Sequence, residues 1–311
     1  MNGKRLQHQY KHHLSGFTNW EKKSHSRQWL IYPENIGSHL SIDETSLSQG
    51  ELYTIITNKK AKGKKGALVG IFKGTKAEPI INRLLKLPDA MRNKVQEITL
   101  DMAHSMKQIV KTCFPKALQV TDRFHVQKLA IDALKDLRIK YRWEAMDQEN
   151  EQIKQSKEQQ REYTPKILAN RDTPKQLLAR SRYLLYKASN DWTTSQANRA
   201  TLLFDLYPEL QKAYKLVNGL RNIFNQPYDI KVAYTKLAHC YRDVELAGFK
   251  SFQTVANSMS LNYRSILNYF INRNTNASAE SFNAKIKAFR TQFRGVKNTE
   301  FFWYRLTKIV A

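Results

Sequence analysis

The order of apolar segments within residues 38–130 constrains the fold of this chain more than any other feature. Three short runs rich in β-branched residues come first, and helix-like and strand-like segments then alternate. Three consecutive strands can pair as an antiparallel meander, whereas alternating strands and helices require parallel crossover connections. We therefore predict an α/β fold with a mixed five-stranded sheet.

Two aspartates stand at the ends of strands in this pattern. Asp43 ends the first predicted strand, and Asp101 follows the fourth. The order β-β-β-α-β-α-β-α is that of the ribonuclease-H-like fold, in which the first and fourth strands are neighbours, so the two carboxylates would lie side by side. The predicted strands are residues 40–43, 52–57, 67–72, 95–100 and 118–121, and the predicted helices are residues 76–87, 102–114 and a long helix from residue 124.

The strand pattern ends near residue 130, and a helical block follows it. Its strongly polar part, residues 138–175, is expected to form a projecting or mobile arm. Glu280 comes only after this block, so a site shared by Asp43, Asp101 and Glu280 requires the block to be an inserted all-α domain. The expected domains are a basic N-terminal arm (1–37), the first part of the core (38–130), the helical insertion (131–274) and C-terminal helices that complete the core (275–311).

The charge of the chain points to a polyanionic partner. There are 52 Lys and Arg against 27 Asp and Glu, which gives a formal charge of +25. A nucleic-acid backbone is the obvious target. Five lysines cluster in one turn, where they serve either solvation or phosphate contact: Lys59, Lys60, Lys62, Lys64 and Lys65.

Other features narrow the class of protein. No apolar stretch is long enough to span a membrane, and only two cysteines are present, which excludes a disulfide framework or a Cys-rich zinc site. This composition fits a reducing cytoplasm. The cluster His8, His12 and His13 is either part of a solvated basic arm or, less plausibly, a metal site.

Three carboxylates in these settings suit divalent-metal chemistry. Hard cations such as Mg²⁺ prefer oxygen ligands, and a metal pair can stabilise both the attacking and the leaving oxygen of a phosphoryl transfer. Glu280 lies on a predicted helix, roughly opposite an apolar stripe expected to pack on the inserted domain: Phe282, Ile286, Phe289 and Phe293. Either Glu280 is simply solvated there, or its face approaches the strand ends and serves catalysis.

The chain resembles insertion-sequence transposases of the DDE type, in the group with a large helical insertion before the Glu. The matching segments are 40–45, 99–103, 120–126 and 276–287. The resemblance implies a transposase that catalyses metal-dependent DNA cleavage and strand transfer. It implies that Asp43, Asp101 and Glu280 are the catalytic, metal-binding triad, with Asp43 bridging two Mg²⁺ ions, for which Mn²⁺ can substitute.

Further residues are assigned more loosely. Asp122, His125 and Asn283 are candidates for supporting the metal ligands, although a helix cap and a partly buried histidine explain the first two equally well. Lys287 shares the Glu280 face and is a candidate for phosphate contact. Trp192 is expected in a core or a subunit contact, with stacking on an unpaired base as the alternative. Glu44 is expected to point away from Asp43, because side chains alternate along a strand.

The expected partner is double-stranded DNA, at both element ends and target, bound by a homo-oligomer in the bacterial cytoplasm at the nucleoid. Members of this group usually carry an N-terminal zinc-binding and helix-turn-helix region. Only 37 residues precede the predicted core, so we expect a separate polypeptide to recognise the ends. Two alternatives remain open: a structure-selective nuclease on the same fold, and a catalytically dead DNA-binding protein derived from a transposase.

Overall fold

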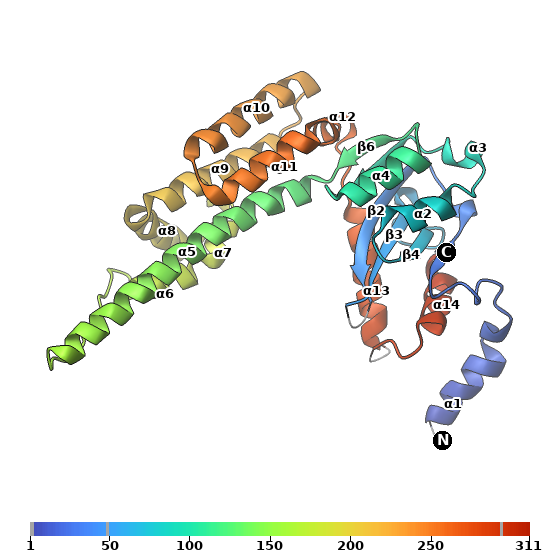
Figure 1. The fold of residues 1–311 in the computed structure, drawn as a ribbon, viewed down its shortest axis with the longest axis horizontal. Coiled ribbons are helices and arrows are strands. Elements are labelled where there is room, and N and C mark those ends of the chain that lie inside the picture. Colours follow the sequence, from blue (N-terminus) through green and yellow to red (C-terminus); the bar gives the residue numbers. More distant parts are fainter. Residues whose placement is uncertain (1–2, 48–49, 293–294) are drawn as a thin grey trace. The chain divides into compact units, whose positions relative to one another are not determined.

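The computed structural model describes residues 3–47, 50–292 and 295–311 and divides the chain into two compact units. Unit 1 combines Met1–Asp122 with Arg264–Ala311, and unit 2 is Arg123–Tyr263. Two stretches of sequence far apart in the chain thus form one α/β unit, and a helical unit is inserted between them (Figure 1). The architecture is the α/β fold with a helical insertion that the order of segments predicted.

The sheet of unit 1 has six strands in the order β1-β4-β3-β2-β5-β6. Strands β2, β3 and β4 form an antiparallel meander, and β5 and β6 add to β2 in parallel. The first and fourth predicted strands, β2 and β5, are therefore neighbours, as expected. The bounds are β1 Trp29–Ile31, β2 His39–Ser46, β3 Leu52–Asn58, β4 Leu68–Lys73, β5 Glu97–Leu100 and β6 Leu118–Thr121.

The count of five strands was wrong, because β1 adds a sixth at the edge of the sheet. Residues Trp29–Ile31 pair antiparallel with β4, and Leu30 is fully buried. This strand lies within the segment predicted to be a basic arm. Three residues are too few to show the period of two by which a strand is recognised, so the sequence pattern does not predict this strand.

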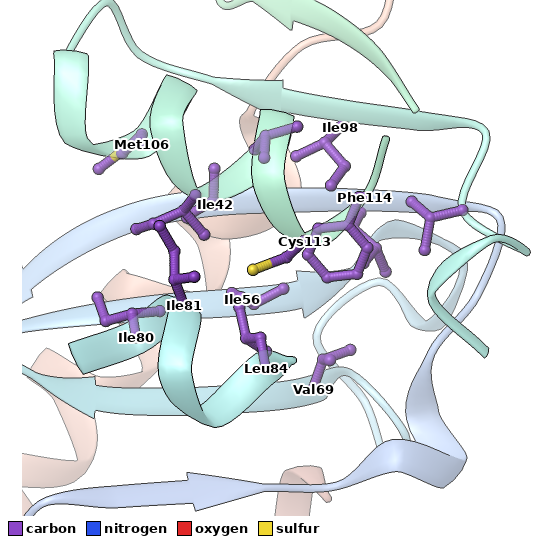
Figure 2. Close-up of a cluster of buried hydrophobic side chains, with 14 of the residues drawn as sticks. Ile42, Ile56, Val69, Ile80, Ile81, Leu84, Ile98, Met106, Cys113 and Phe114 are labelled. Atoms are coloured by element: carbon purple, nitrogen blue, oxygen red, sulfur yellow. The ribbon is translucent and has the colours of Figure 1, made fainter. Parts of the chain in front are cut away.

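Helices cover both faces of the sheet. Apolar residues of α2 (Ala77–Leu84) and α4 (His104–Cys113) pack on one face with Leu40, Ile42 and Ile98. Figure 2 shows this cluster, with Cys113 and Phe114 beside Ile56. The short helix α3 (Asp89–Arg92) follows α2. The apolar residues of α2 and α4 recur at helical spacing, so they lie on one side of each helix and shield this face of the sheet from water.

The opposite face is covered by α13 (Ala277–Gln292) and α14 (Thr299–Val310). Phe282 and Ile286 of α13 pack with Trp303 of α14 against Tyr53 and Ile55 of the sheet. The apolar stripe of α13 thus packs on the sheet, and the expectation that it packs on the inserted domain was wrong. Of the residues in that stripe, Phe293 lies outside the described part of the chain.

The N-terminal segment is folded onto unit 1 by aromatic contacts. Phe17 is buried against Phe301 and Tyr304 of α14, with ring centroids 5.1 and 5.5 Å apart. The segment contains short helical elements rather than a free arm: α1 (Gly3–Gln9), the π-helix η1 (Tyr10–Leu14) and the 3₁₀ turns η2 (Phe17–Asn19) and η3 (Pro33–Asn35).

Unit 2, all of whose residues the structure describes, is helical and contains no β-strand. Its helices are α5 Arg123–Glu158, α6 Pro174–Arg180, α7 Arg182–Tyr186, α8 Thr194–Leu206, α9 Pro208–Asn225, α10 Ile230–Ala247 and α11 Lys250–Leu267, of which α11 leads to α12 Tyr269–Asn272 in unit 1. Thr193 caps α8 through a reciprocal bond pair with Gln196. The end of α5 extends beyond its neighbouring helices (Figure 1). None of the described helices is long and apolar enough to cross a membrane.

Candidate active site

Asp43 and Asp101 occupy equivalent positions on adjacent parallel strands. The register pairs Leu40 with Ile98 and Ser41 with Thr99. Asp43 lies two residues after Ser41, still within β2, and Asp101 lies two residues after Thr99, directly after β5. Parallel neighbours lie about 4.8 Å apart, so the sheet brings both aspartates to one place at the carboxyl end of β5. The sequence predicted that the two carboxylates would be neighbours in the sheet, and this register is the observation that agrees with it.

Hydrogen bonds orient both carboxylates. Asp43 Oδ2 accepts a bond of 2.8 Å from Asn283 Nδ2, and Asp43 Oδ1 accepts one from the backbone N–H of Glu44. Asp101 Oδ1 accepts a bond of 2.6 Å from the backbone N–H of Ala103, in the turn that leads into α4.

Three side chains, two in α13 and one directly before it, donate hydrogen bonds to β2 or to Leu47, which follows β2. Asn276 donates to the backbone carbonyl of Ile42, Asn283 donates to Asp43 and to the carbonyl of Glu44, and Arg290 donates to the carbonyl of Leu47. These residues follow one another at intervals of two helical turns, so they form a single stripe on the helix. The stripe faces β2 and the loop that follows it.

Glu280 belongs to this same stripe, one turn before Asn283 and four residues after Asn276. Its side chain is exposed. Glu280 is therefore on the helix that is bonded to the strand carrying Asp43, and its carboxylate is open to solvent. Lys287 lies one turn beyond Asn283 on the stripe and is also exposed. The predicted metal ligand and the predicted phosphate contact thus share one face of α13.

Glu44 is a further carboxylate near Asp43 and Asp101. Burial raises its pKa, and the negative charges of Asp101 and then Asp43 raise it further. Alternation along β2 gives Glu44 the opposite orientation to Asp43, which is why the sequence argument set it aside. The signal that was missed is proximity to Asp101, which comes from the neighbouring strand and cannot be seen in the residues around Glu44.

The remaining supporting candidates are separated by the structure into different units. Asp122 is fully buried after β6 in unit 1, and its backbone N–H bonds the carbonyl of Leu100. His125 lies partly buried in the first turn of α5, in unit 2. Trp192 is half-buried and packs within unit 2: its ring lies 5.3 Å from that of Tyr214, and its Nε1 donates to the carbonyl of Leu184.

Lys59 does not belong with the other lysines of its turn. Its side chain is only 13% exposed, its Nζ lies 3.5 Å from a carboxylate oxygen of Glu97, and it donates to Thr99 Oγ1. Burial lowers its pKa, which Glu97 partly offsets. The assignment of Lys59 to DNA contact is therefore corrected to an internal ion pair. Lys60, Lys62, Lys64 and Lys65 are exposed.

The donor set suits a hard divalent cation. Asp43 and Asp101 supply carboxylate oxygens, the ligand type that Mg²⁺ prefers. Among the described residues, no three His, Cys, Asp or Glu side chains are already arranged as a metal-binding group. Of the predicted triad, the sheet register joins Asp43 and Asp101, and Glu280 is linked to them only through its helix.

Comparison with known proteins agrees with this architecture. A family model described as "Transposase", of the ISL3 type of DDE transposases, matches residues 40–306. The match begins within β2, ends within α14 and spans the inserted helical unit. No curated protein and no solved structure matches the chain. Because the family model covers most of the chain, including both parts of the α/β unit, this protein belongs to the ISL3-type family of DDE transposases.

Proposed function

We propose that this transposase cleaves DNA and transfers its strands by metal-dependent phosphoryl transfer, with Asp43, Asp101 and Glu280 as catalytic carboxylates. The observation that carries the proposal is the register of β2 and β5, which gives Asp43 and Asp101 equivalent positions on neighbouring parallel strands. The hydrogen bond from Asn283 to Asp43 also supports the proposal, because it attaches the helix that carries Glu280 to β2.

In this proposal the carboxylates hold the cations, and neighbouring groups orient the carboxylates. Asp43, Asp101 and Glu280 would hold two Mg²⁺ or Mn²⁺ ions, which when bound would activate the attacking oxygen and stabilise the leaving oxygen. Asn283 and the backbone N–H of Ala103 hold the two aspartates in fixed orientations. Lys287, exposed on the same stripe as Glu280, is suited to neutralise a DNA phosphate.

The charge of the chain fits DNA as the substrate. A formal charge of +25 favours tight, salt-dependent binding to the phosphate backbone. Such binding positions the duplex but does not read its sequence. Catalysis in this scheme depends on alignment of the DNA strand with the carboxylates, and not on a covalent intermediate with the protein.

The test is a cleavage assay with the purified chain and a DNA fragment that carries the ends of its own element. With Mg²⁺ we expect cleavage at the ends and joined products, and neither with EDTA. Asp43→Asn, Asp101→Asn and Glu280→Gln should abolish both while leaving DNA binding intact. Glu78→Gln, which neutralises an exposed carboxylate on α2, is the matched control.

The products also separate this function from its alternatives. Nicks or breaks without joined strands would assign the chain to a structure-selective nuclease. Binding without any metal-dependent cleavage would identify a DNA-binding protein without catalytic activity. If the triad variants retain wild-type cleavage, the three carboxylates are not the catalytic groups, and the proposal fails.

A further inference from the structure

A cavity of about 480 Å³ opens in unit 1 between the N-terminal helices and helices α13 and α14. None of its lining residues belongs to the proposed triad. Its walls come from α1, η1, α13, α14 and the connection between α13 and α14. The volume lies within the range of about 300–1,000 Å³ that is common for small-ligand pockets. The residues that matter for its chemistry are Lys11, His12, Phe289, Lys297, Phe301 and Arg305.

The cavity is lined by cations and imidazoles. Lys11, Lys297 and Arg305 contribute positive charge, and no Asp or Glu occurs among its described lining residues. The pKa of His12 is lowered by partial desolvation and then by His8 and Lys11. Lys11, Lys297 and Arg305 would attract an anion such as a phosphate to this cavity.

Aromatic rings line the same cavity and lie next to its cations. Lys11 Nζ is 5.8 Å from the centroid of the Phe301 ring, and the guanidinium of Arg305 is 5.9 Å from that of Phe289. Phe289 is only partly buried. A flat, partly open ring beside a cation suits a ligand that carries both an aromatic ring and a negative charge. A nucleotide combines a stacking base with a phosphate.

We propose that this cavity binds one unpaired nucleotide of the DNA, with its phosphate at Lys11, Lys297 and Arg305 and its base against Phe289. The identity of the ligand rests on the proposed function, which makes DNA the substrate. The site is separate from the carboxylates that would carry out cleavage. Its role is to hold a base that has left the duplex, since stacking on a ring compensates for the stacking that the base loses.

The test measures binding in EDTA, so that it does not depend on cleavage. Fluorescence anisotropy compares three labelled probes: a blunt duplex, the same duplex with a single-stranded overhang, and that overhang made from abasic nucleotides. The abasic probe keeps every phosphate and removes only the bases. The variant is Lys11→Ala with Lys297→Ala, and the control removes two exposed lysines of the α2–α3 region, Lys86→Ala with Lys94→Ala.

We expect the wild-type chain to bind the normal overhang at least about fivefold more tightly than the abasic one, the lower end of what one stacked base contributes. The Lys11 and Lys297 variant should lose at least about fivefold more affinity for the overhang probe than for the blunt duplex. The control should weaken all three probes alike. Equal binding of normal and abasic overhangs, or equal loss on overhang and blunt probes, would overturn the proposal.

A measurement on the unaltered chain guards against misfolding of the variant. A photoreactive thymine analogue in the overhang should crosslink to peptides that contain Phe289 or Phe301. Crosslinks confined to other parts of the chain would also overturn the proposal. Because none of these assays needs metal, an inactive enzyme with a working cavity can be told apart from an active enzyme whose cavity does not bind a nucleotide.

Discussion

Asn283 connects the two elements on which the proposed catalytic carboxylates stand. Its Nδ2 atom donates both to Asp43 Oδ2, at 2.8 Å, and to the backbone carbonyl of Glu44, at 3.3 Å. One amide therefore fixes the orientation of a predicted metal ligand on β2 and the position of the helix that carries Glu280. Groups that orient metal ligands commonly matter almost as much as the ligands themselves.

Replacing Asn283 tests this role at the residue scale. Asn283→Ala removes the donor to Asp43, so cleavage should fall by about 10–100-fold and should recover partly at higher Mg²⁺ concentration. Ser281→Ala, an exposed position on the same helix, is the control. Cleavage rates measured across a Mg²⁺ titration decide the matter. A reduced rate with unchanged Mg²⁺ dependence would show that Asn283 does not act through the metal ligands.

Lys59 supplies a second test, because its ion pair with Glu97 is largely shielded from water. Lys59→Met leaves the Glu97 carboxylate, which is about 2% exposed, with only the amide of Asn272 as its remaining described partner. Loss of one member of a buried pair costs about 3–5 kcal/mol. Urea unfolding should show a loss of this order, and Lys59→Met with Glu97→Leu should regain part of it. A loss below about 1 kcal/mol for the single variant would contradict the buried pair.

The surroundings of Lys59 and Glu44 could not be predicted from the residues next to them in the sequence. A run of five lysines predicts a charged turn, but only the fold reveals that one of them reaches Glu97 on another strand. Alternation predicts that Glu44 points away from Asp43, but the charge that affects it most among its neighbours belongs to Asp101. In both cases the partner is distant in sequence, whereas the strand ends at Asp43 and Asp101 are visible locally.

At the scale of elements, α13 depends on its apolar stripe to hold Asn283 and Glu280 in place. Phe282 is 1% exposed and packs with Tyr53 and Trp303. Phe282→Ala should therefore destabilise unit 1 by about 3–5 kcal/mol. The exposed Phe124→Ala should cost much less. Thermal unfolding of both variants checks this, and equal losses would show that α13 is not anchored by this residue.

The elements themselves were largely predictable. Each strand of the meander and both parallel strands were located within a few residues, because their β-branched runs are bounded by turns and helices. Strand β1 was missed because three residues carry no recognisable period. The direction in which the stripe of α13 packs was also wrong: a helix pattern shows that one face is apolar, but not which element covers that face.

At the scale of the whole molecule, the charge of +25 should govern DNA affinity. Binding to duplex DNA should weaken by roughly 0.9 log units per log unit of salt for each phosphate contacted. Replacing the four exposed lysines of the β3–β4 turn by alanine should flatten this slope without loss of stability: Lys60, Lys62, Lys64 and Lys65. Affinity measured over a salt series checks this. An unchanged slope would mean that these lysines serve only solvation.

We propose that Asp43, Asp101 and Glu280, which come from two separate stretches of the chain, share one metal site in unit 1. Fe²⁺ accepts the same carboxylate ligands as Mg²⁺ and, with ascorbate and peroxide, cuts the polypeptide close to where it is bound. We predict cuts near residues 43, 101 and 280 that excess Mg²⁺ suppresses and that Asp43→Asn abolishes, while Glu78→Gln leaves them unchanged. Cuts elsewhere, or cuts near 43 and 101 without any near 280, would contradict the shared site.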